Sequence, residues 1–200
     1  MTQPDIRYYR LRDDHLRETV YNWWARLAGL QADGETPNAD GAARAERAVL
    51  RRARSPDDAM LTEGFRRLWF ELPANERSPR WMPAWASVAV VLSNVRRHRA
   101  DKSFAASLGE RADDYGDKPV FSELRFRQLQ QSRSPEELTR RLQRAVHLLR
   151  ETAHVVCLAD NIIQWHHEYA GNPARRPEER LAVRWAQAYF DEIQSYQQSA

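Results

Sequence analysis

The sequence predicts an all-α protein of about eight helices that form two packed helical bundles. Apolar residues recur at helical spacing along most of the 200-residue chain, and runs of β-branched residues are rare. Serine, aspartate or proline stands where most of the helical runs begin, as helix starts favour. Hydrophobic residues make up 42% and charged residues 30% of the chain, which is typical of a globular protein with a sizeable core.

Four helices are expected in the N-terminal bundle, residues 1–105, at about 13–29, 42–53, 55–72 and 83–95. Asp13 and Asp14 can cap the first helix, and Gly29 marks its end. A polar loop at 31–41 follows it. Ser55 and the proline after it mark the start of the third helix. The fourth is apolar almost throughout, which indicates a buried helix, although its middle could form a strand by itself.

Residues 99–118 are polar and are interrupted by two glycines, which places a boundary between the bundles in this stretch. The C-terminal bundle, residues 106–200, is expected to pack closely against the first. It should contain a short helix at about 119–131 and three more that begin at Pro135, near residue 155 and at Pro177. Ser134 is a strong start signal, because it precedes a proline and stands three residues before a glutamate.

The composition and the motifs exclude several classes of protein. Cys157 is the only cysteine, which rules out an internal disulfide, and its apolar neighbours predict a buried, inert thiol. No apolar run approaches the roughly 20 residues that cross a bilayer, and the N-terminus lacks the apolar stretch of a signal peptide. We therefore expect a cytoplasmic protein without a membrane partner. The chain has no nucleophile elbow, phosphate-binding glycine loop or dinucleotide fingerprint, so neither catalysis nor a cofactor is expected.

The histidines and tryptophans have structural interpretations. Glu151 and His154 show the Glu-x-x-His spacing of bundle di-iron sites, but no second copy of the motif exists, so no metal is expected. His166 and His167 are adjacent, point to different faces, and are interpreted as an exposed helix end. Five of the seven tryptophans occupy apolar helix positions and are expected in the core: Trp23, Trp69, Trp85, Trp165 and Trp185.

Arginine carries nearly all the positive charge, with 29 arginines and two lysines in a chain of net charge +3. Arginine binds phosphate oxygens two at a time, but a GC-rich genome produces the same composition. The distribution of charge along the chain is more informative than the total. Residues 96–150 hold 13 basic and 8 acidic residues, whereas residues 151–200 hold 4 and 7. The middle of the chain is therefore basic and its C-terminal end is acidic.

Two predicted helices carry cations on one face. The second helix has four arginines at spacings of 3, 4 and 3 residues: Arg44, Arg47, Arg51 and Arg54. The helix after Pro135 has a similar face: Arg140, Arg144 and His147. An ordinary solvated helix face mixes both signs of charge, whereas a stripe of one sign can neutralise phosphates without reading base sequence. A solvated face and a polyanion-binding face both remain possible for each stripe.

The order of these features resembles the CasB family, the small subunit of the type I-E CRISPR Cascade complex. The resemblance covers most of residues 15–195, and the ordered set of segments carries it: 21–27, 44–52, 107–109, 122–129, 132–144, 160–165 and 185–190. It implies an all-helical, non-catalytic subunit that helps to hold opened target DNA and stabilises the R-loop. It also implies its partners, namely the other Cascade subunits, the guide RNA, the target DNA strands and a second copy arranged head to tail.

The resemblance also implies which residues bind nucleic acid. On matching positions these are Arg44, Arg47, Arg51, Arg52, Arg125, Arg127, Arg133, Arg141 and Arg144. The helix-face argument adds three more: Arg54, Arg97 and Arg140. Two other classes stay open, a helical DNA-binding transcriptional regulator and a bundle-type metal or ligand protein. The first lacks a convincing helix-turn-helix unit, and the ligand set of the second is incomplete.

Overall fold

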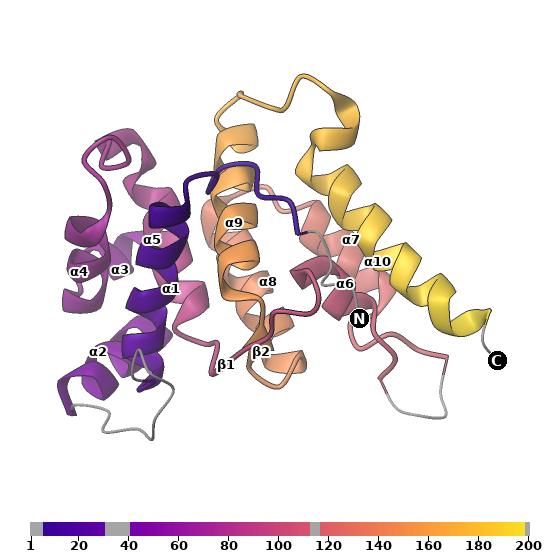
Figure 1. Cartoon of the computed structure of the whole chain (residues 1–200), viewed down its shortest axis with the longest axis horizontal. Coiled ribbons are helices and arrows are strands. Elements are labelled where there is room, and N and C mark those ends of the chain that lie inside the picture. The colour runs from indigo at the N-terminus through magenta and orange to yellow at the C-terminus, as the bar shows by residue number, and fades with distance from the viewer. Residues whose placement is uncertain (1–5, 31–40, 113–116, 199–200) are drawn as a thin grey trace.

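A computed structural model describes residues 6–30, 41–112 and 117–198, and it confirms the all-α prediction (Figure 1). The α-helices of this part are α1 (Asp14–Ala28), α2 (Gly41–Arg52), α3 (Pro56–Met60), α4 (Glu63–Glu71), α5 (Met82–Leu92), α6 (Phe104–Gly109), α7 (Glu123–Gln130), α8 (Pro135–Leu148), α9 (Val155–Tyr169) and α10 (Leu181–Gln197). The 3₁₀ helices are η1 (Pro79–Trp81) and η2 (Pro177–Glu179), and two short strands pair in parallel, β1 (Arg97–His98) and β2 (Thr152–Ala153). Most of the predicted loop at 31–41 lies outside the described residues.

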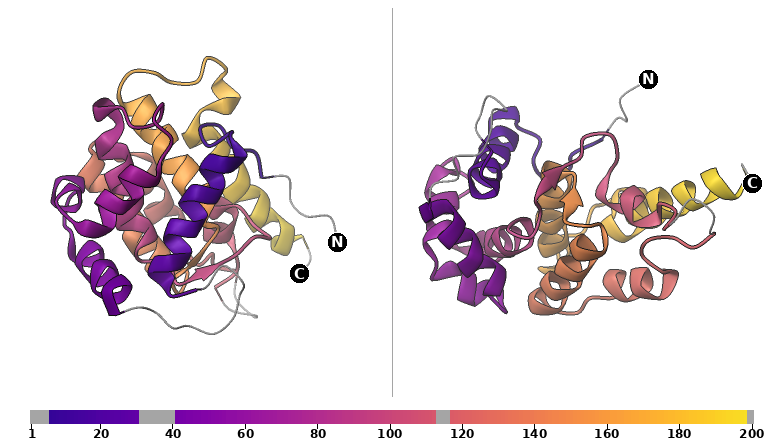
Figure 2. Two further views of the ribbon diagram at one scale, coloured as in Figure 1. Left: turned by 60° about the vertical axis from the view of Figure 1, so that its left-hand side comes forward. Right: turned by 90° about the horizontal axis from the view of Figure 1, so that it is seen from below.

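Helices α8 and α9 lie in the middle of the molecule, with α1–α5 on one side and α6, α7 and α10 on the other (Figure 1, Figure 2). Helix α5 packs against both α8 and α9, and α6 packs along α10. Every residue of α5 from Ala84 to Leu92 is buried, as expected for a helix that is apolar all round. One cluster of buried apolar side chains runs from Leu11 to Ile193. The division into two bundles at residue 105 stays a prediction, and this cluster contains residues from both sides of it.

Most of the predicted helix starts are confirmed at the level of hydrogen bonds. The side chain of Asp13 accepts the N–H of Leu16, and the hydroxyl of Ser134 accepts the N–H of Glu137. Gly29 ends α1 with a φ of 78°, the left-handed conformation that glycine adopts without strain. None of the described helices has the length and apolar character that crossing a bilayer requires.

The prediction of one helix over 55–72 is wrong, because the chain forms α3 and α4 with a break at Leu61 and Thr62. The hydroxyl of Thr62 accepts the N–H of Phe65 at 3.2 Å and thereby caps a new helix. Leu61, an apolar residue inside the predicted helix, is 85% exposed. Helix α6 also lies within 99–118, the stretch predicted to contain the boundary between the bundles, and Ser103 caps it by accepting the N–H of Ala106.

Two helix boundaries differ from the predicted ones. Helix α5 ends at Leu92, before Val95, whose backbone oxygen accepts the indole N–H of Trp24. The segment that begins at Pro177 forms only the turn η2, and α10 begins at Leu181.

The interpretation of His166 and His167 as an exposed helix end is wrong. His166 is 6% exposed and its Nε2 lies 2.9 Å from the hydroxyl of Ser87 in α5. The ring of His167 stacks on Trp81 with centroids 3.7 Å apart. Helix α9 packs against α5 and is buried from Val155 to His166, which a single sequence does not reveal.

The predictions for the apolar residues are mostly confirmed. Trp23, Trp85, Trp165 and Trp185 are buried, and Trp69 is partly buried against the same core. Cys157 is buried, and burial raises the pKa of its thiol to about 11, as expected for an unreactive cysteine.

Candidate nucleic-acid interface

A groove of about 690 Å³ lies between α7 and α8 and collects many of the predicted arginines. Its lining consists of Asn94, Phe121, Arg125, Gln128, Arg140, Arg141, Gln143, Arg144, His147 and Leu148. Half of these lining residues are arginine or histidine, and none is acidic. In a chain of nearly balanced charge, a groove with this lining attracts anions.

The arginines face the groove because the opposite face of α8 is buried. Leu138, Leu142, Ala145 and Val146 pack into the core, so residues at the complementary helical positions point outward. Arg140 and Arg144 are exposed and lie one helical turn apart. Helix α7 is anchored in the same way, since Phe126 stacks on Tyr189 with ring centroids 4.0 Å apart. Arg125 then projects toward the groove from the other wall.

The arginines of the groove have two different roles. Arg141 donates hydrogen bonds to the backbone oxygen of Gln128 and the hydroxyl of Ser132, and it pairs with Glu137 at 2.6 Å. It therefore fixes the connection between α7 and α8. Within the described residues, Arg125, Arg140 and Arg144 form no such bond and remain available to a ligand. Arg127 and Arg133 are exposed but do not line the groove.

The arginines of α2 are divided between its inner and outer faces. Arg47 donates to the backbone oxygens of Ser93 and Val95 at 2.8 and 3.1 Å, so it closes the C-terminal end of α5. Burial, together with nearby Arg96 and Arg51, lowers the pKa of Arg47 to about 10, which leaves it charged at neutral pH. Arg44 and Arg52 are exposed on α2, whereas Arg54 lies beyond the helix end and does not continue the stripe.

Arg51 and Arg96 share one carboxylate next to the groove. Arg51 Nη2 lies 2.8 Å from Glu151 Oε1, and Arg96 Nε lies 2.7 Å from Glu151 Oε2. Glu151 lies three residues beyond the end of α8, and Arg96 is two residues from Asn94 in the groove lining. The structure thus brings the inner arginines of α2 to the end of the groove along α8.

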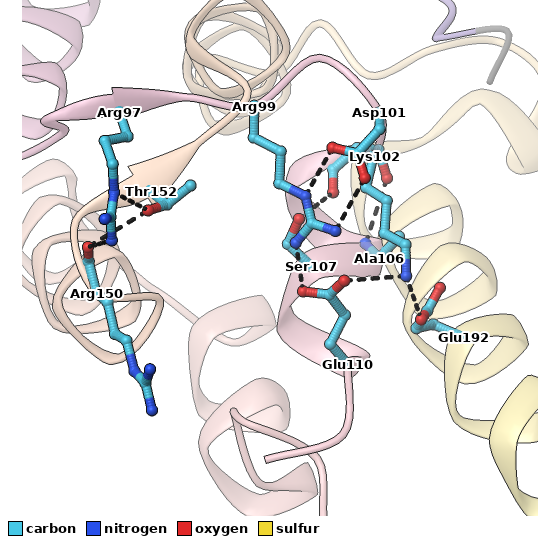
Figure 3. A network of polar contacts seen from close by, with 11 residues as sticks. Arg97, Arg99, Asp101, Lys102, Ala106, Ser107, Glu110, Arg150, Thr152 and Glu192 are labelled. Carbon is cyan, nitrogen blue, oxygen red and sulfur yellow. Dashed lines mark hydrogen bonds and ion pairs between the residues drawn. The ribbon is translucent and has the colours of Figure 1, made fainter. Parts of the chain in front are cut away.

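The basic surface ends at a network of ion pairs around α6 (Figure 3). Arg97 is exposed and donates to the Thr152 hydroxyl and to the backbone oxygen of Arg150. Beyond it, Arg99 pairs with Asp101 and Glu110, and Lys102 pairs with Glu110 and Glu192. Burial alone would raise the pKa of Glu110, but hydrogen bonds from Arg99 and Lys102 outweigh it and hold the pKa below its usual value. The charges of Arg99 and Lys102 are therefore already neutralised by carboxylates of the protein.

Sequence reasoning missed several groups of this surface. Asn94, Gln128 and Gln143 supply polar groups to the groove, and Glu151 and Arg96 form the ion-paired end. Gln143 shares the face of His147 by helical spacing, so the periodicity could have found it. Asn94 follows α5 and Glu151 follows α8, so the packing of these two helices brings both residues to the candidate interface. The sequence contains no local signal for that packing.

The di-iron spacing of Glu151 and His154 has a different use in the structure. Glu151 is occupied by two arginines, and Nδ1 of His154 accepts the N–H of Cys157 and thereby caps α9. In the part of the chain that the structure describes, no group of three His, Cys, Asp or Glu residues is placed to hold a metal.

Comparison with known proteins places most of the chain in a described family. The family of CRISPR-associated protein Cse2 matches residues 46–190, which include α3 through α9 and most of α2 and α10. Comparison with curated proteins and with solved structures gives no match.

Proposed function

The chain belongs to the Cse2 family, also called CasB, of type I-E Cascade subunits, and we propose that it holds strands of opened target DNA through sequence-independent phosphate contacts. The observation that carries this proposal is the groove between α7 and α8, which has no acidic lining residue and contains three arginines without an ion pair among the described residues. Arginine forks of this kind bind phosphate oxygens in pairs.

The groove is better suited to contacts with the phosphate backbone of a nucleic acid than to recognition of its bases. Phe121, the Phe, Tyr or Trp residue among the groove-lining residues, is only 3% exposed, so its ring offers almost no face on which a base can stack. In an RNA-guided complex, base pairing with the guide reads the sequence, and the proteins hold strands by their backbones. Because R-loop opening is nearly balanced in free energy, a few phosphate contacts are enough to favour the open state. No catalytic step is needed for this role.

The proposed partners follow from the family. They are the other Cascade subunits, the guide RNA, the target DNA strands and a second copy arranged head to tail. The acidic C-terminal segment is proposed to contact the basic middle of that copy, and Glu178 is exposed in it. Reversal of charge at Glu178 and Glu179 should weaken association between copies, and unchanged assembly in sedimentation would contradict this contact.

Filter binding of single-stranded or bubble DNA over a salt series tests the proposal. We expect Arg140→Glu with Arg144→Glu to weaken binding more than about tenfold at low salt and to reduce the salt slope by about 1.4. Arg175→Glu with Arg176→Glu is the matched control, because it makes the same charge change at exposed arginines outside the groove. Equal losses of affinity in both variants would refute the groove as the binding site for nucleic acid. Sequence-specific binding to duplex DNA would favour a transcriptional regulator instead.

A further inference from the structure

Glu151 stands alone among three arginines at the end of the groove. Its two carboxylate oxygens each contact a different guanidinium, Arg51 at 2.8 Å and Arg96 at 2.7 Å. Arg47 lies close to the Glu151 carboxylate, Arg51 and Arg96, because the charges of these three residues influence the pKa of Arg47. A phosphodiester also presents two anionic oxygens, so two arginines that hold a carboxylate in this way also have the groups needed to hold a phosphate.

The backbone adopts a disfavoured conformation in the turn that ends α8 and carries this carboxylate. Arg150 and Glu151 have φ values of 54° and 58°, and they are the only non-glycine residues with positive φ in the described part. The turn is held by the backbone oxygen of Glu151, which accepts the N–H groups of Arg96 and Arg97 at 2.7 and 3.1 Å. Non-glycine residues in this region cost free energy and persist only where the surroundings fix them.

The cluster continues the surface proposed to bind nucleic acid. His147 and Leu148 line the groove and immediately precede the turn that carries Glu151. Asn94 lines the same groove two residues before Arg96, whose side chain is 61% exposed. Through Glu151, Arg51 and Arg96 therefore lie beside the C-terminal end of α8, the end of the groove that His147 and Leu148 line.

We propose that Glu151 occupies the position of a nucleic-acid phosphate between Arg51 and Arg96, and so limits the affinity of the subunit for nucleic acid. A phosphate group must displace the carboxylate before these arginines can hold a strand. A free subunit is then not trapped on bulk nucleic acid, whereas in an assembled complex other contacts raise the effective concentration of the strand. The inference rests on the proposed function and concerns the regulation of its surface.

The test compares Glu151→Gln with the wild type on single-stranded DNA and RNA of equal length. We expect binding about 3- to 10-fold tighter at low salt, with a salt slope steeper by about 0.7 to 1.4 because one or two more phosphates are contacted. Glu63→Gln is the control for net charge, since Glu63 pairs with Arg66 and Arg67 on α4. It should stay within about twofold of the wild type, because those arginines lie outside the groove lining.

A double-mutant cycle separates this role from a purely structural one. In an Arg51→Ala background, Glu151→Gln should give a clearly smaller gain, because one of the two released cations is absent. Glu151→Asn is the second variant, since asparagine tolerates positive φ while removing the charge, and it should bind tighter even if the glutamine variant folds poorly.

Each outcome bears on a different claim. Affinity that is unchanged or weaker in folded Glu151 variants, with wild-type binding intact, overturns the inference alone. A gain in Glu63→Gln as large as in Glu151→Gln also overturns it, because net charge would then explain both. If neither the wild type nor the variants bind either strand at the lowest salt, the proposed function fails as well.

Discussion

The arginines of α8 and those of α2 have nearly the same spacing in the sequence but different surroundings in the structure. Arg140 and Arg144 project into an acid-free groove. Arg47 and Arg51, by contrast, turn inward, where one closes the end of α5 and the other pairs with Glu151. The difference teaches that a one-sided stripe of cations identifies a helix face, but does not show which part of the protein or solvent lies opposite that face. Helix α2 meets the C-terminal end of α5, whose exposed carbonyl groups attract cations.

Histidines also differ between exposed and buried positions, and for them we expect the largest change in the free energy of unfolding. His147 is exposed in the groove, whereas His154 and His166 are buried, which lowers the pKa of each to about 4. The unfolded chain takes up these protons near pH 6.5 and the folded chain only near pH 4, so stability is lost as the pH falls through this window. Between about pH 7 and pH 4 the wild type should lose about 3 kcal/mol more than His166→Gln.

Urea unfolding across that pH range measures the difference. Glutamine is the chosen replacement because its amide can still bond to the hydroxyl of Ser87, the partner of His166. His147→Gln is the matched control from the groove, and its unfolding curve should follow the wild type over the whole range. Parallel loss of stability in the wild type and His166→Gln would contradict the buried neutral histidine.

A second prediction tests the inward-facing arginine against the outward-facing one. Arg47→Ala should lower the free energy of unfolding by about 2 kcal/mol, because it removes charge-assisted hydrogen bonds to the end of α5. Arg144→Ala should lower it by less than about 0.5 kcal/mol, since an exposed side chain without a partner contributes little. Chemical unfolding of both variants checks the pair, and similar losses would erase the distinction between the two helices.

A third prediction concerns the start of α8, on which the groove depends. Ser134→Ala should cost about 1 kcal/mol, because the N–H of Glu137 loses its cap. Fraying of this turn also loosens the Glu137–Arg141 pair, so nucleic-acid binding should weaken slightly. Ser134→Asp should restore most of the stability, and its failure to do so would argue against a capping role.

The smallest effect is expected on the outer face of α2. Arg44→Glu with Arg52→Glu should weaken nucleic-acid binding by no more than about threefold at low salt, because these exposed residues do not line the groove. Filter binding beside Arg140→Glu with Arg144→Glu makes the comparison direct. Equal losses would mean that α2 and α8 contribute alike, and would extend the interface across both helices.

Much of the fold could be read from local signals. The starts at Asp13, Ser55 and Ser134 follow from capping side chains, and the burial of α5 follows from its apolar sequence. The break at Thr62 was missed, although threonine is a capping residue, because apolar spacing continues across it. Burial of His166 was missed because it depends on Ser87, which lies 79 residues away in the sequence.

The sequence alone determined the all-α class, the positions of most helices and the clustering of arginine on two helix faces. These properties depend on spacing, capping and charge within a few residues, which any stretch of chain carries with it. Only the tertiary structure decided which arginines are free and which are bound, because that depends on what lies opposite each helix. The carbonyl groups at the end of α5 and the carboxylate of Glu151 occupy the cations of α2, while the groove leaves those of α8 available.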